Sequence, residues 1–463
     1  MLGTRIRWAF VALAALILSW QLFLPPITGL ADQGDFRRVI GRFGFIGADQ
    51  SARFGFLART YIKDAHSRLY EYEQTTSEYV FVGAAVLLNK LVSKDGNFDI
   101  TMVGLVHVLA FLYAFYLLLA ATATLRAAPL IWFLALLVLT DAGRATFWNS
   151  FYAEPASCIF FLLLVAESIP ICRTGELSAA QAARWALWAF LWIFAKPVNT
   201  PEGLLLLLFA FRLRSWGISP ASRRAAIAGA VLIAVAIVSN VATLPKVHEW
   251  STIYDEVFLS ILPESKTPAS DAKALGLPVE WVKYSGTGAW SPGTNLEQGV
   301  VTGVIGKQVT NLSVLKFYVL HPTRIWRHAK RMLPVAFSLR PEWCGNFERS
   351  SGMPALGKSQ AFSVWSAIHD HVLTPIGKPL LIALMLCPFV CIAAWFRWAD
   401  QRRFFEFFGL LGVCCLIAFL VAICGDAWDN VKHLFLFNLL LDAWLVTLIA
   451  FLFQRARKVL YGI

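Results

Sequence analysis

Two carboxylates lie three residues apart in the segment Asp32-Gln-Gly-Asp35-Phe-Arg-Arg38, directly after the first long apolar run. Charged side chains at such a place need water, a partner or a substrate. One turn of chain would point Asp32 and Asp35 toward the same space. One of them would then be a general base for an acceptor hydroxyl, while the other orients it or binds a divalent cation, Mg²⁺ or Mn²⁺. The alternative is an ion pair with a neighbouring arginine.

A third carboxylate, Glu154, directly precedes Pro155. Proline suits the first turn of a helix, so Glu154 would lie at the positive end of a helix dipole. Its two interpretations are a further catalytic carboxylate and a helix cap. Asn149 and Tyr152 nearby offer hydrogen-bond donors of the kind that bind sugar hydroxyls.

Four cationic side chains lie at the predicted outer ends of membrane spans, where topology does not favour them: Arg144, Lys196, Lys432 and His433. A bound phosphate would explain them, because Arg and Lys give charge-assisted hydrogen bonds to phosphate oxygens. The alternative is pairing with nearby acids such as Asp141, Glu202, Asp426 and Asp429.

Asn438 and Asp442 form a polar pair deep in the last apolar run. Such a pair is either a functional group of the membrane interior or a helix-to-helix hydrogen bond, with His107 as one candidate partner.

The composition places these groups in a membrane protein. Of 463 residues, 58% are hydrophobic and only 15% are charged, against about 25% charged in a typical soluble protein. The net charge of +12 comes from short basic clusters between apolar runs. That placement follows the positive-inside rule and argues against nucleic acid as a partner.

About 20 apolar residues are needed to span a bilayer. The sequence predicts an all-α integral membrane protein of about ten spans, near residues 8–24, 100–122, 129–141, 154–171, 184–196, 201–213, 225–244, 376–396, 405–424 and 433–453. Each segment predicted to lie inside carries Arg or Lys, so both termini are predicted to be cytoplasmic and the unusual polar loops extracytoplasmic.

Three units follow from this pattern: an N-terminal transmembrane module (1–244), an outer loop region (245–375) and a C-terminal transmembrane module (376–463). Residues 78–91 and 316–337 combine apolar and charged side chains, as helices lying on the membrane surface do.

The pattern resembles the membrane glycosyltransferases of the GT-C type. The acidic first loop, the surface helix at 78–91, the polar stretch from Asp141 to Glu154 and the outer cations carry the resemblance. More closely, four strings resemble a bacterial glycan-biosynthesis hexose transferase group of surface-layer glycans. They are Asp32-Gln-Gly-Asp-Phe-Arg-Arg, Phe147-Trp-Asn-Ser-Phe-Tyr-Ala-Glu-Pro, Val257-Phe-Leu-Ser-Ile-Leu-Pro-Glu-Ser and Lys432-His-Leu-Phe-Leu-Phe-Asn.

The resemblance implies a GT-C fold and inverting transfer of a hexose from a polyprenyl-phosphate donor to a glycan or lipid acceptor of the cell envelope. It places the enzyme in a bacterial cytoplasmic membrane, with Asp35 or Asp32 as the base and an active site on the extracytoplasmic face. It leaves a metal requirement open. The alternative function is a transporter or flippase of a lipid-linked saccharide, which would use the deep pair Asn438 and Asp442.

Overall fold

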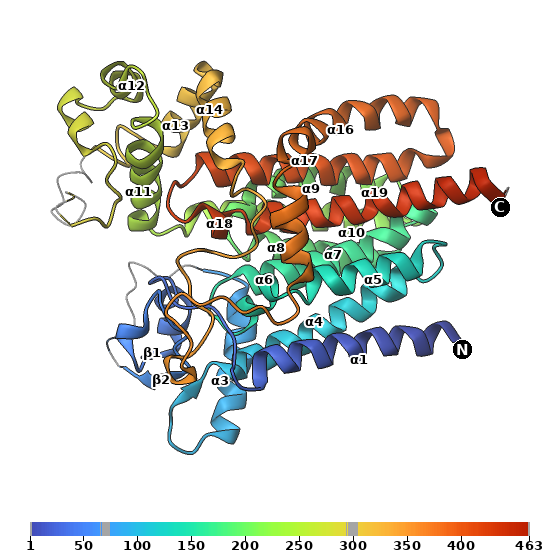
Figure 1. Ribbon diagram of the computed structural model, residues 1–463. Coiled ribbons are helices and arrows are strands. Elements are labelled where there is room, and N and C mark those ends of the chain that lie inside the picture. Colours follow the sequence, from blue (N-terminus) through green and yellow to red (C-terminus); the bar gives the residue numbers. More distant parts are fainter. Residues whose placement is uncertain (1, 65, 67–74, 293, 295–303, 462–463) are drawn as a thin grey trace.

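A computed structural model describes residues 2–64, 66, 75–292, 294 and 304–461. Long helices fill most of this part of the chain (Figure 1). The helical bundle consists of α1 (Leu2–Phe23), α4 (Thr101–Thr122), α5 (Ala128–Leu139), α7 (Glu154–Thr174), α8 (Ala179–Ile193), α9 (Thr200–Arg214), α10 (Pro220–Ala242), α16 (Gly377–Arg397), α17 (Arg402–Cys424) and α19 (Phe435–Tyr461).

Seven of these helices are long and apolar enough to cross a membrane. The number is eight if α5 and the following segment 142–148, bent by 54° relative to it, count as one span. The helices α8 and α9 have 15 residues each, which is short for a span, and both pack against α10. The prediction of an α-helical integral membrane protein is confirmed, and the helices match the predicted runs.

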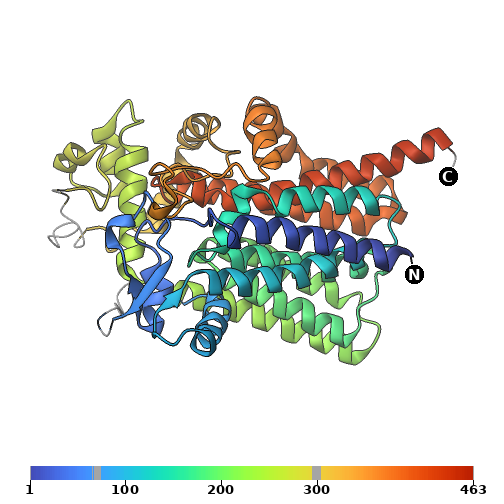
Figure 2. The ribbon, with the colours of Figure 1, turned by 60° about the horizontal axis from the view of Figure 1, so that its bottom comes forward.

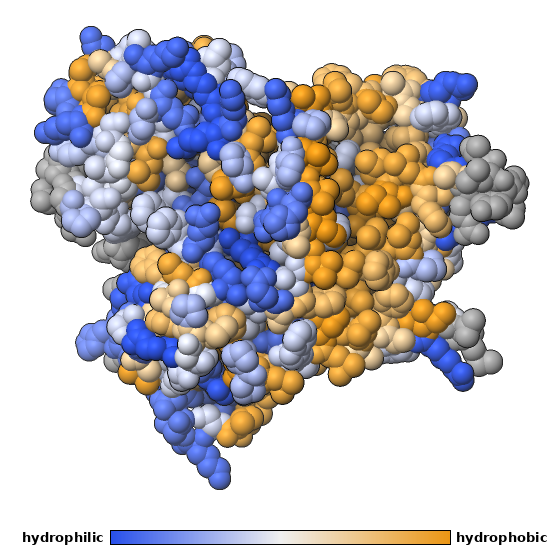
Figure 3. Space-filling view, viewed as in Figure 1, coloured by the Kyte–Doolittle hydropathy of each residue, from blue (hydrophilic) through white to orange (hydrophobic). Residues whose placement is uncertain are grey.

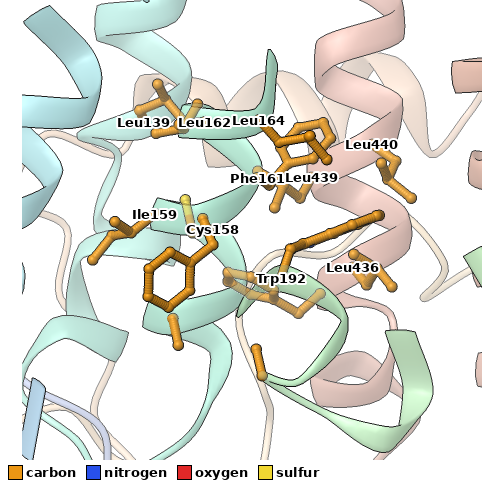
Figure 4. Packing of buried hydrophobic residues seen from close by; sticks show 14 of the residues in the cluster. Leu139, Cys158, Ile159, Phe161, Leu162, Leu164, Trp192, Leu436, Leu439 and Leu440 are labelled. Carbon is orange, nitrogen blue, oxygen red and sulfur yellow. The ribbon is translucent and has the colours of Figure 1, made fainter. Parts of the chain in front are cut away.

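The helix α7 lies at the centre of the bundle. In its apolar window 72% of the residues are buried inside the protein, against 28% for α1 and for α16. Phe161 of α7 packs against Trp192 of α8, with ring centroids 5.5 Å apart, and Figure 4 shows both in a cluster that also contains Leu436 and Leu439 of α19. Because α7 is packed on several sides, the residues just before it are held firmly in place.

The two ends of the bundle differ. Both termini lie at one end, called here the terminus end, and the large polar segments gather at the other, called the loop end (Figures 1 and 2). Figure 3 shows a hydrophobic surface over the bundle and a more hydrophilic surface over the loop end. The large polar segments therefore share one end of the bundle, as the sequence predicts, while the side of the membrane that they face stays a prediction.

The first loop segment contains α2 (Arg37–Ile40), α3 (Glu78–Val92) and a small antiparallel sheet of β1 (Phe45–Gly47), β2 (Thr60–Lys63) and β3 (Phe98–Asp99). The helix α3 matches the predicted surface helix 78–91. The sheet was not predicted, because strands of two to four residues are too short to show a period-two pattern.

The described residues of 246–292 and 304–332 form a separate lobe with its own hydrophobic cluster, built around Tyr254, Phe258 and Phe317. Its helices are α11 (Lys246–Asp255), the π-helical turn Glu256–Ile261, α12 (Pro268–Leu275), α13 (Asn311–Leu320) and α14 (Pro322–Met332). The prediction of one helix over 316–337 is wrong: the chain forms two, separated at His321. The residue before a proline is disfavoured in the α conformation, so Pro322 begins a new helix.

After α14, buried residues between Ala336 and Leu373, including those of α15 (Val364–Ile368), join the main core instead of the lobe. Two short helices, α6 (Ala142–Ala145) and α18 (Asn430–His433), complete the loop end. The division at 245–375 stays a prediction.

A stretch around Gly345 holds the chain that leads into the acidic segment, which is the name used here for residues 32–38. Backbone N–H groups of Gly29 and Ala31 donate to the carbonyls of Asn346 (3.0 Å) and Gly345 (2.9 Å). The N–H of Gly345 donates in turn to the carbonyl of Phe54 (2.8 Å). These bonds hold the chain that leads into Asp32.

A side chain at Gly345 would break this packing, because a Cβ there would lie 1.9 Å from the backbone oxygen of Gly55. We expect Gly345→Ala to lower the free energy of unfolding by about 1–3 kcal/mol, measured by thermal unfolding of the purified protein. Gly83→Ala is the control, since its Cβ meets Phe43 at an ordinary 3.6 Å. Equal stability of the two variants would contradict this account of the loop.

Candidate functional site

Asp35 lies between two cations. Its Oδ2 accepts a hydrogen bond from Nζ of Lys432 at 2.8 Å, and its Oδ1 pairs with the Arg38 guanidinium at 3.0 Å. Burial by itself would raise the pKa of Asp35, but Arg38 and Lys432 outweigh it and hold that pKa well below its usual value. Asp35 is therefore an ionised carboxylate at neutral pH.

Lys432 is buried at the loop end on the short helix α18. Its ammonium group also donates to Oε1 of Gln33 at 2.8 Å, and it lies 5.0 Å from the ring centre of Tyr152. Gln33 donates onward to Oδ2 of Asp429 at 2.6 Å. Burial would lower the pKa of Lys432, but Asp35 and Asp429 together raise it, so the lysine is charged.

Asp32 has a different environment, although it is only three residues away. Its Oδ1 accepts the backbone N–H groups of Gly34 (2.6 Å) and Phe36 (3.1 Å). This turn needs Gly34, whose φ of +110° is a conformation that other residues rarely adopt. In the described part of the chain no hydrogen bond reaches Oδ2. Burial raises the pKa of Asp32 more than the two N–H bonds lower it.

Tyr152 holds the backbone around the acidic segment by hydrogen bonds of its hydroxyl group. Its hydroxyl donates to the carbonyl of Ala31 and accepts the N–H of Gln33, both at 3.0 Å, while its ring packs edge-on against Phe36. Asn149 is also a clamp: its buried amide donates to the carbonyls of Leu22 (2.9 Å) and Thr28 (2.7 Å). The contacts of Asn149 are therefore with the end of α1 and the chain after it, not with the carboxylates.

Glu154 pairs with Lys196, with 2.6 Å between Oε1 and Nζ. As predicted, Glu154 begins α7 and Pro155 lies in its first turn. Glu154 is buried and contributes to the raised pKa of Lys432. Charges therefore alternate from Lys196 through Glu154 and Lys432 to Asp35.

His433 lies next to Lys432 and approaches Asp426, with 3.3 Å between Nε2 and Oδ2. The separate lobe adds His248 of α11, which is close enough to Arg38 and Asp35 to feel their charges. Its Nδ1 is buried and accepts or donates no hydrogen bond among the described residues. Burial first, and then Arg38, lower the pKa of His248, so its imidazole is neutral at pH 7.

Arg144 lies away from this group. It donates to the Asp442 carboxylate and, at 3.1 Å, to the carbonyl of Asn438. Asp442 also pairs with His369 at 2.8 Å. All three members of the Arg144–Asp442–His369 network are buried. Asp442 is thus bound by Arg144 of α6 and by His369, which directly follows α15. His107, the suggested partner of the deep pair, is instead bound to Glu78 at 2.7 Å.

The donor set does not fit a metal ion at Asp35, because both of its oxygens are bound by cationic groups. Among the residues that the structure describes, no group of three or more His, Cys, Asp or Glu side chains is placed to hold a metal ion. The chemistry considered below rests on protein groups.

The structure thus brings four predicted site residues together, with two more beside them as the Glu154–Lys196 pair. The four are Asp32, Asp35, Tyr152 and Lys432. Sequence reasoning gave no site role to Gln33, Arg38, Asp429 or His248. Asp429 carried a faint signal as one of two acids just before the Lys-His pair, while His248 carried none.

These observations define a helical membrane protein with a polar site at one end, built from the first loop, the start of α7 and the short helix α18. A family model described as the YfdI N-terminal transmembrane domain matches residues 5–460. The chain belongs to this family. A search of curated proteins found no match.

Two solved structures of oligosaccharyltransferases from Archaeoglobus fulgidus are similar to the chain. One is tethered to an acceptor peptide containing the NVT sequon, with 11% identity, a TM-score of 0.39 and coverage of 98% of this chain and 51% of that one. The other, AglB in complex with an inhibitory peptide and a dolichol-phosphate, has 13% identity, a TM-score of 0.37 and coverage of 99% and 52%. The chain spans about half the length of these proteins, and the likeness is too distant to assign an activity.

The role of Arg144 is open to a direct test. We expect Arg144→Leu to destabilise the protein by about 3–5 kcal/mol, because it leaves the Asp442 carboxylate buried without its guanidinium. Thermal unfolding of purified variants measures the effect. The double variant Arg144→Leu/Asp442→Leu should recover much of the loss, since no lone charge remains. If Arg144→Leu is as stable as the wild type, Arg144 is free for a ligand.

The ion pair of Asp35 predicts a pH dependence of stability. Because its folded-state pKa is lowered, its contribution is complete above the usual value of about 4 and is lost as pH falls below that. We expect Asp35→Asn to cost about 2 kcal/mol at neutral pH, and the difference from wild type to shrink below about pH 4. Chemical unfolding across this pH range measures it. A difference that grows on acidification would refute the assignment.

Proposed function

We propose that the protein is a membrane glycosyltransferase of the GT-C type. It transfers a sugar, which we expect to be a hexose, from a polyprenyl-phosphate donor to a glycan or lipid acceptor at the loop end. The observation that carries the proposal is the pair of unlike carboxylates: Asp32 has a free oxygen, while Asp35 beside it holds Lys432 and Arg38. A base and a set of phosphate-binding cations are what such a transfer requires.

In the proposed step, the acceptor hydroxyl oxygen attacks the anomeric carbon of the donor sugar and its proton passes to Oδ2 of Asp32. The bond between the anomeric carbon and the phosphate oxygen breaks, and its electron pair leaves with the lipid phosphate. Lys432 and Arg38 stabilise the charge that develops on this phosphate. Attack opposite the leaving group inverts the configuration.

Asp32 suits the role of base better than Asp35 does. A general base works best when its pKa is near the working pH, and the pKa of Asp32 is raised whereas that of Asp35 is lowered. Asp35 is instead a positioning residue that aligns two cations. A phosphate that approaches them would share Lys432 and Arg38 with Asp35.

The other residues predicted for the site hold or surround the two aspartates and Lys432. Lys196 and His433, each paired with an acid, surround the cluster and extend its positive charge toward the donor phosphate. Glu154 holds Lys196, and Tyr152 holds the backbone of the acidic segment. A transporter is less well supported, because the deep groups that it would need, Asp442 and Asn438, are bound within the bundle.

We further propose that the loop end faces away from the cytoplasm of a bacterial cell. Arginines such as Arg126, Arg173 and Arg403 lie at the terminus end, as the positive-inside rule requires of a cytoplasmic face. An envelope glycan or lipid acceptor follows from this orientation.

The test is transfer of labelled sugar from a polyprenyl-phosphate donor by the full chain in proteoliposomes. We expect Asp32→Asn to lower the rate by about 10²–10⁴-fold. The amide oxygen of Asn can still accept the N–H groups of Gly34 and Phe36, so the fold should persist. Lys432→Gln should weaken binding of the donor and also slow the step.

Asp49→Asn is the matched control, an exposed acid of the same loop that pairs with Arg349. It should retain wild-type activity. Full activity of Asp32→Asn would overturn the assignment of the base. Absence of any transfer by the wild type, together with movement of lipid-linked sugar across the bilayer, would overturn the enzyme in favour of the transporter.

A further inference from the structure

A large cavity lies at the terminus end, away from the polar site. Its volume is about 620 Å³, within the range of ligand sites, which is about 300–1,000 Å³. It is lined by α4, α5, α7, α17 and α19 and is partly open to the outside of the bundle. No residue of the acidic segment lines it, so it is a separate space with its own chemistry.

The walls of the cavity are apolar along most of their length. Side chains such as Ile131, Val138, Leu162, Val165 and Val446 line it. The lining stretch of α19 runs from Leu439 to Arg455, which is about 24 Å at 1.5 Å per residue. A hydrocarbon core is about 30 Å thick. The cavity is therefore long and oily, which suits a lipid chain better than a compact polar molecule.

Its mouth is basic. Four arginines from four different segments line it: Arg126, Arg173, Arg403 and Arg455. Asp400 is the acid that lines the same mouth, so four positive charges face one negative charge. Basic pockets between membrane helices at a cytoplasmic face are of the kind that bind lipid headgroups.

The hydrogen bonds found for Arg173, Arg403 and Arg455 are all to neutral acceptors. Arg173 donates to the Thr124 hydroxyl, Arg403 to the backbone carbonyl of Arg173 (3.3 Å), and Arg455 to the Gln401 amide oxygen (2.5 Å). None of these acceptors is a carboxylate. By contrast, Arg184 and Arg212, also toward this end, are bound by Glu167 and Glu406. The arginine side chains at the mouth are therefore held in place by neutral groups, and their positive charge is available to an anion.

We propose that this cavity is a binding site for a membrane lipid whose phosphate headgroup carries a net negative charge. The hydrocarbon chain fills the apolar space between α5, α7 and α19, and the arginines at the mouth hold the phosphate. The site is distinct from the donor site proposed at the loop end. An anionic phospholipid and a polyprenyl phosphate share this chemistry, and the test separates them.

The test measures binding and not transfer, so it does not depend on the proposed activity. The purified full chain is stripped of lipid and titrated with phosphatidylglycerol, polyprenyl phosphate or phosphatidylcholine. Native mass spectrometry counts bound lipid, and the unfolding temperature reports stabilisation, which rises with ligand concentration for a specific site. We expect one or both anionic lipids to bind as a single retained adduct and phosphatidylcholine to bind far more weakly. Whichever anionic lipid binds identifies the source.

Two kinds of variant locate the site. Arg173→Gln/Arg403→Gln should weaken binding about 30-fold, at about 1 kcal/mol for each arginine near a lipid phosphate. Ala443→Leu should block the apolar space while leaving every arginine in place. Arg224→Gln is the matched control, an exposed arginine near the same end that does not line the cavity.

Loss of binding in the double arginine variant and in Ala443→Leu, with Arg224→Gln unchanged, supports the site. Equal binding of phosphatidylcholine overturns it, as does wild-type binding in both the double variant and Ala443→Leu. An equal loss in Arg224→Gln also overturns it, because the effect would then come from general surface charge.

Discussion

The ion pair between Asp35 and Lys432 is the interaction on which the loop end depends. It joins residues 397 positions apart, one in the loop after the first helix and the other just before the last. Lys432 is buried, and a lone buried ammonium would be costly. Gln33, Asp429 and Tyr152 pack around the pair. If the first loop moved away from α18, the buried ammonium group of Lys432 would lose the Asp35 carboxylate, which is costly.

This constraint also explains why two aspartates in one turn differ. Asp35 faces two cations and stays ionised, whereas Asp32 is bound by backbone N–H groups, and burial raises its pKa. Enzymes often use pairs of acids whose surroundings push their pKa values apart. Here the difference arises because Gly34 turns the chain between the two side chains.

The charged groups in the middle of the helical bundle are paired with one another and hold the helices together. An intramembrane carboxylate is by default a functional hypothesis, yet Asp442 is bound by Arg144 and His369. Asp442 lies on α19, between Lys432 of the preceding helix α18 and the basic mouth at Arg455. It gives the bundle a fixed centre, with different chemistry at its two ends.

The sequence by itself determined the apolar runs that form the long helices and the polarity of the first loop, because apolar length and the placement of charged residues are local properties. It also placed Glu154 at the start of α7, where Pro155 marks the first turn. Only the tertiary structure decided which charges meet. Arg144 joined Asp442 instead of the outer site, Asn149 became a clamp, and His248 arrived from a distant lobe. Pairings over hundreds of residues leave no periodic trace, since they depend on how helices pack and not on neighbouring residues.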